Sequence, residues 1–151
     1  MKKIFLLTGH ANFGKSKTLI ELTGTTNSQH FSINGIDFAL KRVSNDDIKG
    51  KALKYIKDVI KNNRYDRMIV AFCPDFKNKN RYSQEIIDTL LQNNFSLYFF
   101  VLMKCYRSDE TVKEDEIDQL KKAGNVYLCN LDSENAKKRA AKFKEYIIEN
   151  M

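Results

Sequence analysis

The fold of this chain is decided by the stretch at residues 9–16, which reads Gly9-His10-Ala11-Asn12-Phe13-Gly14-Lys15-Ser16. The stretch fits the pattern G-x-x-x-x-G-K-[ST] at every fixed position. In this spacing, one glycine opens a turn and another lets the backbone approach an anion, so that successive N–H groups point at phosphate oxygens. We expect Lys15 to reach the β and γ phosphates and the Ser16 hydroxyl to take one coordination position of Mg²⁺. The stretch therefore predicts a phosphate-binding loop.

The segments on either side of this loop support the same prediction. Residues 4–7 form an apolar run that is typical of a buried strand. A helix is expected from about residue 15, and its positive N-terminal end would add to the attraction for anions. Lys15 is expected to be a loop residue at the surface. We predict nucleotide contacts from the whole loop and the residue after it, namely Gly9, His10, Ala11, Asn12, Phe13, Gly14, Lys15, Ser16 and Lys17.

The rest of the chain alternates between apolar runs and helical stripes. Asn34-Gly35 stands between alternating residues and is a strong hairpin signal. Apolar runs at 68–72, 96–102 and 126–129 are followed or preceded by helical patterns. This order predicts an α/β fold with three layers, a mostly parallel sheet of about five to six strands and helices on both faces. Ligands then bind beyond the carboxyl ends of the strands, in the loops at 9–16, 44–47, 73–82, 103–111 and 129–132.

The chain resembles the P-loop NTPase superfamily, and the likeness is carried by Gly9, Gly14, Lys15 and Ser16. The motif covers residues 9–16, and the order of the elements extends the likeness less specifically. The resemblance implies binding of Mg²⁺ with ATP or another purine NTP. The two further motifs that GTPases carry, Asp-x-x-Gly and Asn-Lys-x-Asp, are not matched by the residues at 75–81. The chain looks like a compact core similar to small nucleotide or metabolite kinases, or to minimal ATPase subunits.

A carboxylate is also needed, to hold Mg²⁺ or its waters or to orient the nucleophile. In P-loop proteins this acid normally ends an apolar strand. Here the run at 68–72 is followed by Cys73, and the first acid after it is Asp75, which would serve from slightly further out. Asp46 and Asp47 are the alternatives, although capping of a helix that starts there also explains acids at those positions. Asp75 is therefore the first choice for the metal, together with Ser16.

The positive charge that stabilises the transferring phosphate is expected from Arg107 or Arg81, which lie in loops at the same edge. Arg42 is a further candidate. An ordinary surface arginine is the alternative for each. His10 lies inside the predicted loop, where a side chain more often points outward or fills a gap than acts as an acid or base. Because the chain has only two histidines, no Ser–His–Asp or Cys–His arrangement is expected.

Composition sets outer limits on these predictions. The chain has 151 residues with 42% hydrophobic residues and one proline, which predicts a single domain over residues 1–151. The apolar runs are shorter than a bilayer span, and we expect a cytoplasmic protein with no membrane contact. The three cysteines suggest buried thiols rather than a disulfide framework. The net charge of +7 is compatible with nucleic acid as a partner, although a lysine-rich solvated surface also explains it.

The function expected from these observations is Mg²⁺-dependent binding and hydrolysis of ATP. Lys15 and the loop amides would stabilise charge, Ser16 and Asp75 would serve the metal, and Arg107 or Arg81 would assist. Because the acid is displaced, hydrolysis is expected to be slow and to need a protein partner or an oligomer. The first alternative is a small nucleotide or metabolite kinase, with an acceptor hydroxyl between residues 42–47 and 75–82. The second is a module that binds nucleotide or nucleic-acid phosphates without turnover.

Overall fold

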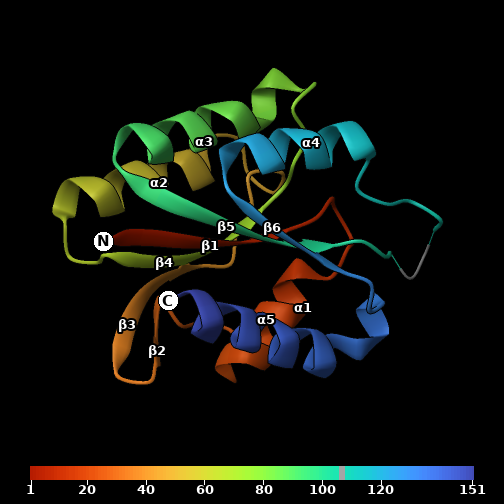
Figure 1. Cartoon of the computed structure of the whole chain (residues 1–151), viewed down its shortest axis with the longest axis horizontal. Helices are drawn as coiled ribbons and strands as arrows, with labels where there is room; N and C mark the ends of the chain where they lie inside the picture. Colours follow the sequence, from red (N-terminus) through yellow and green to blue (C-terminus); the bar gives the residue numbers. More distant parts are fainter. Residues whose placement is uncertain (106–107) are drawn as a thin grey trace.

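The computed structural model describes residues 1–105 and 108–151. Within them, strands and helices alternate along most of the chain (Figure 1). None of the helices in this described part combines the length and the apolar content needed to cross a bilayer. The elements are β1 (Lys2–Thr8), α1 (Lys15–Thr23), β2 (His30–Ile33), β3 (Ile36–Lys41), α2 (Lys51–Asn62), β4 (Arg67–Phe72), η1 (Lys79–Arg81), α3 (Ser83–Gln92), β5 (Phe95–Leu102), α4 (Glu114–Ala123), β6 (Asn125–Cys129), η2 (Ser133–Asn135) and α5 (Ala136–Asn150).

β1 lies inside a six-stranded sheet whose order is β2-β3-β4-β1-β5-β6. It pairs in parallel with β4 on one side and β5 on the other, so that Leu6 lies opposite both Val70 and Phe99. The β3–β4 and β5–β6 pairs are also parallel, and only β2 runs antiparallel, to β3. The turn between β2 and β3 has φ of 50° at Asn34 and 81° at Gly35. These observations confirm the predicted α/β class, the mostly parallel sheet and the hairpin.

Helices cover both faces of the sheet. Figure 1 shows α2, α3 and α4 on one face and α1 and α5 on the other. The strands in the middle are therefore buried from both sides, and residues 4–7 of β1 are all 0% exposed. Aromatic rings fill part of this core, because Phe5 stacks on Tyr98 at 5.0 Å between ring centroids and Phe100 packs against Phe143 of α5 at 5.0 Å. The packed centre gives the loops at the strand ends a rigid base.

The start of α2 differs from the prediction. Its N-cap is Gly50, which has a left-handed φ of 74°, and the helix begins at Lys51. The earlier residues form a separate turn, in which the Ser44 N–H donates to Asp47 Oδ2 at 2.9 Å and the Asp47 N–H donates to the Ser44 carbonyl at 3.1 Å. Ile48, between this turn and the helix, is 51% exposed. Helix capping therefore does not account for Asp46.

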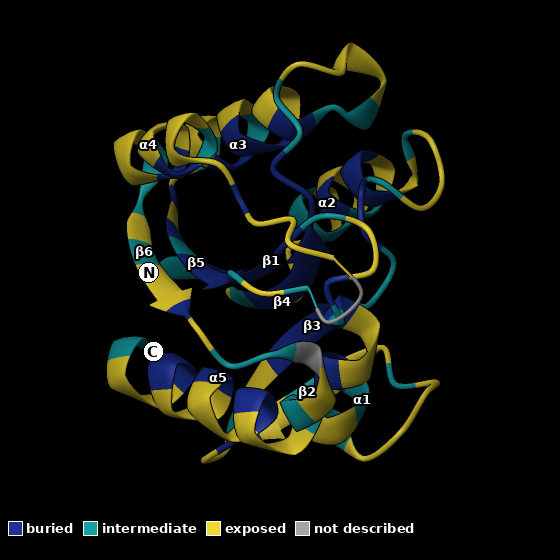
Figure 2. Cartoon of the chain, turned by 90° about the vertical axis from the view of Figure 1, so that its right-hand side faces the viewer, coloured by how far each residue is buried: buried dark blue, intermediate teal, exposed yellow. Residues whose placement is uncertain are grey.

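The carboxyl ends of the parallel strands meet at one edge of the sheet, as predicted. Figure 2 looks onto the side of the molecule that holds this edge, with the buried β1, β4 and β5 behind more exposed loops. The loop between β1 and α1 lies here, beside those that follow β3, β4, β5 and β6. We call residues 9–16 the glycine loop, although its last two residues already belong to α1.

Candidate functional site

The glycine loop is tied to the sheet at its start. The Gly9 N–H donates to the Phe72 carbonyl at the end of β4, at 3.0 Å. A Cβ at Gly9 would lie 3.1 Å from the Phe13 Cβ, so this position leaves little room for any other residue. Asn12 and Gly14 have left-handed φ values of 67° and 87°. Because the N-cap of α1 is Gly14, no side chain at that position can satisfy the first N–H groups of the helix.

The residues of the glycine loop divide between the core and an open cavity. Phe13 is 0% exposed, so its side chain belongs to the core, while its N–H donates to the His10 carbonyl at 3.2 Å and its carbonyl accepts from Arg139 at 2.6 Å. Ala11, Asn12, Ser16 and Lys17 are exposed, as a ligand-binding role requires. The loop borders a cavity of about 630 Å³, which is formed by residues 11–17 together with Arg42, Asp46, Asp47 and Glu134.

Lys15 is a buried cation at the base of this cavity. Its residue is only 8% exposed, which corrects the prediction of a surface loop residue. Nζ donates to the Gly9 carbonyl at 2.6 Å and to the His10 carbonyl at 3.0 Å. Nζ also lies 3.6 Å from Asp46 Oδ2. The ammonium is thus held inside the curve of the glycine loop and faces a carboxylate from the loop that follows β3.

Asp46 is the acid that the structure places beside Lys15. Its side chain is 5% exposed. The second carboxylate oxygen, Oδ1, is buried and has no hydrogen-bond partner among the described residues. An unpartnered buried carboxylate oxygen is costly, because the oxygen loses its water without gaining a donor. A metal ion or a ligand donor would remove that cost.

A buried amide holds the turn that carries Asp46. The Asn45 Nδ2 donates to the carbonyls of Cys73 and Arg81 and to the Ser83 Oγ, each at 3.0 Å. The Asn45 Oδ1 accepts the Cys73 N–H at 2.6 Å. The guanidinium of Arg81 donates to the Asp46 carbonyl. Arg81, predicted to assist on the phosphate, therefore holds the backbone of the acid, and it is not among the residues that form the Lys15 cavity.

Asp75 lies elsewhere along the same edge. It lines a second cavity of about 540 Å³, together with His10, Lys77 and residues around the start of α4. Its carboxylate is not part of the Lys15 cavity, whose acids among the described residues are Asp46, Asp47 and Glu134. The structure thus brings Lys15 together with an alternative acid and separates it from the first-choice acid. Arg107 lies outside the described residues.

His10 connects the glycine loop to β4 and α4. Its Nε2 lies 2.8 Å from Glu116 Oε1, and its Nδ1 lies 3.6 Å from Cys73 Sγ. Burial first, and then the charge of Asp46, raises the pKa of the Cys73 thiol to about 12, so the sulfur carries its proton at neutral pH. The pattern fits an S–H donor to Nδ1 and an Nε2–H donor to Glu116. No such arrangement was expected from the sequence, because the partners are 63 and 106 residues away from His10.

Arg139 is the functional candidate that the sequence reasoning missed. It lies on the inner side of α5 and is 0% exposed. Its Nη1 donates to the Phe13 carbonyl of the glycine loop at 2.6 Å. The signal was available, because position 139 lies four residues before the apolar Phe143 and therefore on the same helix face.

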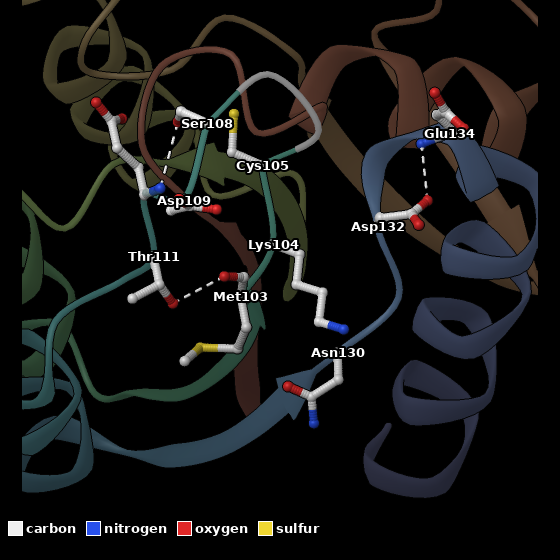
Figure 3. A pocket seen from close by; sticks show the side chains of 10 residues that line it. Met103, Lys104, Cys105, Ser108, Asp109, Thr111, Asn130, Asp132 and Glu134 are labelled. Atoms are coloured by element: carbon white, nitrogen blue, oxygen red, sulfur yellow. Dashed lines mark hydrogen bonds between the residues drawn. The ribbon is translucent and has the colours of Figure 1, made fainter.

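A third cavity, of about 570 Å³, opens beyond the carboxyl ends of β5 and β6. Its walls include Met103 and Thr111 on one side and Asn130, Asp132 and Glu134 on the other (Figure 3). Hydrogen bonds within these walls run from Thr111 Oγ1 to the Met103 carbonyl at 2.8 Å, from the Glu110 N–H to Ser108 Oγ at 3.3 Å and from the Glu134 N–H to Asp132 Oδ1 at 3.2 Å. Glu134 also lines the Lys15 cavity, so the two cavities adjoin.

The metal-binding capacity of the site is limited. No group of three or more His, Cys, Asp or Glu side chains within the described residues could hold a metal ion. Mg²⁺ needs fewer protein ligands, because it usually takes one or two carboxylates and completes its shell with water and phosphate oxygens. Ser16 and Asp46 are the donors of the Lys15 cavity that suit such an ion.

Comparison of the chain with protein-family models, curated proteins and solved structures finds no match.

Proposed function

We propose that this chain is a P-loop NTPase that binds Mg²⁺ with a purine nucleoside triphosphate, ATP being our first choice, and hydrolyses it. One observation carries the proposal. Lys15 Nζ lies 3.6 Å from Asp46 Oδ2, at a cavity bordered by the glycine loop, and the other oxygen of Asp46 is buried without a partner among the described residues. A cation and an incompletely paired carboxylate at one loop suit a phosphate chain and its metal ion.

The phosphates would lie against the glycine loop. Its backbone N–H groups and the open amino end of α1 would donate to phosphate oxygens. Lys15 Nζ is held ready for them, because the carbonyls of Gly9 and His10 keep it inside the loop. A phosphate oxygen would then replace one of these two carbonyls as an acceptor for the Lys15 ammonium. The buried position would strengthen the attraction between the ammonium and the phosphate, because it excludes water.

The metal ion would be held by the Ser16 hydroxyl and by Asp46, directly or through water. This assignment replaces Asp75 with Asp46, because Asp46 is the acid beside Lys15 and has a buried oxygen without a partner among the described residues. When bound, Mg²⁺ supplies charge neutralisation on the phosphate oxygens. The chain's own part is to hold Asp46 in place, through the hydrogen bonds of Asn45 and Arg81.

The nucleoside would occupy the adjoining cavity beyond β5 and β6. The two cavities adjoin at Glu134, which lines both, and this suits a ligand whose two ends occupy one cavity each. The amide of Asn130 and the carboxylate of Asp132 offer both donors and acceptors to a base or a ribose. Nucleic acid or a protein is a further candidate partner. This suggestion rests on the net charge of +7, to which the surface lysines contribute.

Hydrolysis would be slow without help. Arg42 is the arginine, among the described residues, that lines the Lys15 cavity, and Arg81 is engaged with the Asp46 backbone. Stabilisation of the transferring phosphate by a well-placed arginine is worth about 10³ to 10⁵ in rate. A protein partner or a second copy of the chain would add a further arginine to Arg42.

A kinase is the second candidate, and the cavity at Asp75 favours it. That cavity of about 540 Å³ is bordered by His10 of the glycine loop, although it has no lining residue in common with the Lys15 cavity among the described residues. An acceptor hydroxyl placed there would have the Asp75 carboxylate available as a general base. Binding without turnover is the remaining alternative, in which the same residues would sense nucleotide or nucleic-acid phosphates.

The test is product analysis of γ-labelled ATP with Mg²⁺, with and without a pool of nucleosides and metabolites. Lys15→Ala is the blank, and Lys54→Ala, at an exposed lysine of α2, is the matched control. Free phosphate from ATP alone supports hydrolysis, and label in an acceptor supports the kinase. Binding that Lys15→Ala abolishes, without either product, supports the sensor. Failure of the wild-type protein to bind any purine triphosphate would overturn the proposal.

A further inference from the structure

Arg139 joins three separate loops at the carboxyl edge of the sheet. Its Nη1 donates to the Phe13 carbonyl of the glycine loop at 2.6 Å. Its Nη2 donates to the Lys104 carbonyl after β5 at 2.7 Å, and its Nε donates to the Leu131 carbonyl after β6 at 2.8 Å. The first loop borders the Lys15 cavity, and the other two border the cavity beyond β5 and β6.

The guanidinium is also a buried charge with neutral partners. Arg139 is 0% exposed, and burial lowers the pKa of its guanidinium. None of the ion pairs found between described residues involves it. Its hydrogen-bond partners are carbonyls, and the Asp132 carboxylate offsets only part of the effect of burial on its pKa, so burying this cation costs more than burying an apolar side chain in the same place. An apolar side chain would therefore attach α5 at a lower cost in free energy. What the guanidinium adds, and an apolar side chain would not, is the link between the three loops.

We propose that Arg139 is a positioning residue that couples the nucleoside-side cavity to the phosphate-binding loop. The inference rests on the proposed function, because it assigns one ligand to both cavities. A planar guanidinium can hold three carbonyls in one fixed geometry, which a lysine ammonium at the end of a flexible chain cannot reproduce. Arg139 thereby sets how far the Phe13 backbone lies from the Lys104 and Leu131 backbones.

The other direct contacts between these loops are weaker. Cys105 Sγ lies 3.5 Å from the Asn12 carbonyl, and a thiol is a weak donor. The Met103 N–H donates to the Cys129 carbonyl at 3.0 Å, but that bond joins the β5 and β6 sides and does not reach the glycine loop. Arg139 is therefore the strong connection between the phosphate side and the nucleoside side within the described residues.

Arg139→Lys keeps the positive charge but removes the planar group that binds the three carbonyls. We expect the affinity for Mg²⁺–ATP to fall at least about tenfold, the scale of one lost charge-assisted hydrogen bond. The affinity for Mg²⁺–tripolyphosphate, which has no nucleoside, should change less than about threefold, because the glycine loop and the positive charge remain. Calorimetric titration of both ligands measures the two affinities. Tyr146→Phe is the matched control, because its hydroxyl contacts Asn125 at the start of β6.

Hydrogen exchange of the wild-type protein provides a second measurement that does not depend on the variant's folding. Tripolyphosphate fills only the phosphate side, yet we expect it to slow amide exchange at Asn130 and Leu131, which do not line the Lys15 cavity as Glu134 does, and this slowing should be lost in Arg139→Lys. The inference is overturned if tripolyphosphate leaves those amides unchanged in the wild-type protein. It is equally overturned if Arg139→Lys weakens ATP and tripolyphosphate by the same factor. Wild-type protein that binds tripolyphosphate but not ATP would instead overturn the proposed nucleotide site itself.

Discussion

Asp46 and Asp75 both follow parallel strands of the same sheet, and both lie in loops at its carboxyl edge. They nevertheless occupy different surroundings. The Asp46 side chain is 5% exposed, faces Lys15 at 3.6 Å and has a buried oxygen without a partner among the described residues. Asp75 is half-buried at another cavity, where its backbone carbonyl accepts the Ser83 hydroxyl at 3.2 Å.

The difference between the two acids shows that closeness to a strand end is not enough to identify a site acid. Asp75 is the nearer of the two to the end of its strand, three residues after Phe72 against five residues from Lys41 to Asp46, yet it lines a different cavity from Lys15. Asp46 reaches Lys15 because the buried Asn45 next to it ties the turn to β4 and α3. Its burial, its position beside Lys15 and an oxygen without a partner among the described residues are the reasons for which we propose Asp46 as the acid that serves the ligand.

Of the substitutions that test this comparison, removal of the Lys15 side chain should have the largest effect on turnover. In Lys15→Ala, we expect turnover of ATP to fall by roughly 10³-fold or more, because the main charge on the transferring phosphate is lost. The change also leaves the buried Asp46 carboxylate without its cation, which is destabilising. The melting temperature should therefore drop as well, in contrast to Lys54→Ala. Turnover at the wild-type level in Lys15→Ala would show that the cavity is not the reaction site.

Exchange of each acid for its amide tests the two cavities against each other. Asp46→Asn should lower turnover by about 10²-fold and raise the Mg²⁺ concentration needed for half-maximal activity, because a neutral amide is a poorer partner for the ion. Asp75→Asn should change ATP hydrolysis less than about threefold. Asp58→Asn, at an exposed position of α2, is the control. A larger loss in Asp75→Asn than in Asp46→Asn would return the metal site to Asp75.

Much of the fold could be predicted from local patterns. The spacing of residues 9–16, the continuous apolar runs and the Asn34-Gly35 pair each act within a few residues, and each predicted element is present. The carboxyl edge follows from the alternation of strands and helices, because parallel strands end on the same side. These features depend on periodicity and turn chemistry, which a single sequence displays.

The candidate site was less predictable because its contacts are long-range. The position of Asp46 depends on a helix that starts only after Gly50 and on an amide that bonds 28 to 38 residues away. Arg139 contacts the glycine loop across 126 residues. A charged residue in a lysine-rich helix gives no local sign that it points inward, apart from its spacing from Phe143.

Loss of the amide that holds Asp46 should have an intermediate effect. Asn45→Ala leaves the buried Cys73 N–H without its acceptor and removes one of the two donors to the Cys73 carbonyl, which the Ser83 hydroxyl still contacts at 2.8 Å. We expect the free energy of unfolding to fall by about 2 to 3 kcal/mol, since an unsatisfied buried group costs about 1 to 3 kcal/mol. Urea denaturation measures this change, with Asn62→Ala at an exposed position of α2 as the control. A change below about 0.5 kcal/mol, the usual range for surface substitutions, would contradict the assigned role.

The smallest expected effect is on the pH dependence of the unfolding free energy, and it arises from the Cys73 thiol, whose pKa both acids raise. Burial, then Asp46, and less strongly Asp75, raise the pKa of Cys73 from its ordinary 9.0 to about 12. The folded chain therefore keeps this proton over a pH range in which the unfolded chain releases it. The contribution to stability is full below pH 9.0 and declines toward pH 12, by up to about 1.4 kcal/mol per pH unit.

This decline should respond differently to the two amide variants. Asp46→Asn removes the stronger of the two acid contributions, so the fall of unfolding free energy between pH 9 and 11 should become shallower than in Asp75→Asn. Urea denaturation at several pH values gives the slopes, and the comparison of slopes cancels the tyrosines that also titrate in this range. Cys73→Ala should remove the difference between the two backgrounds. If Asp75→Asn flattens the slope more than Asp46→Asn, the arrangement of the two acids around β4 is not the one described.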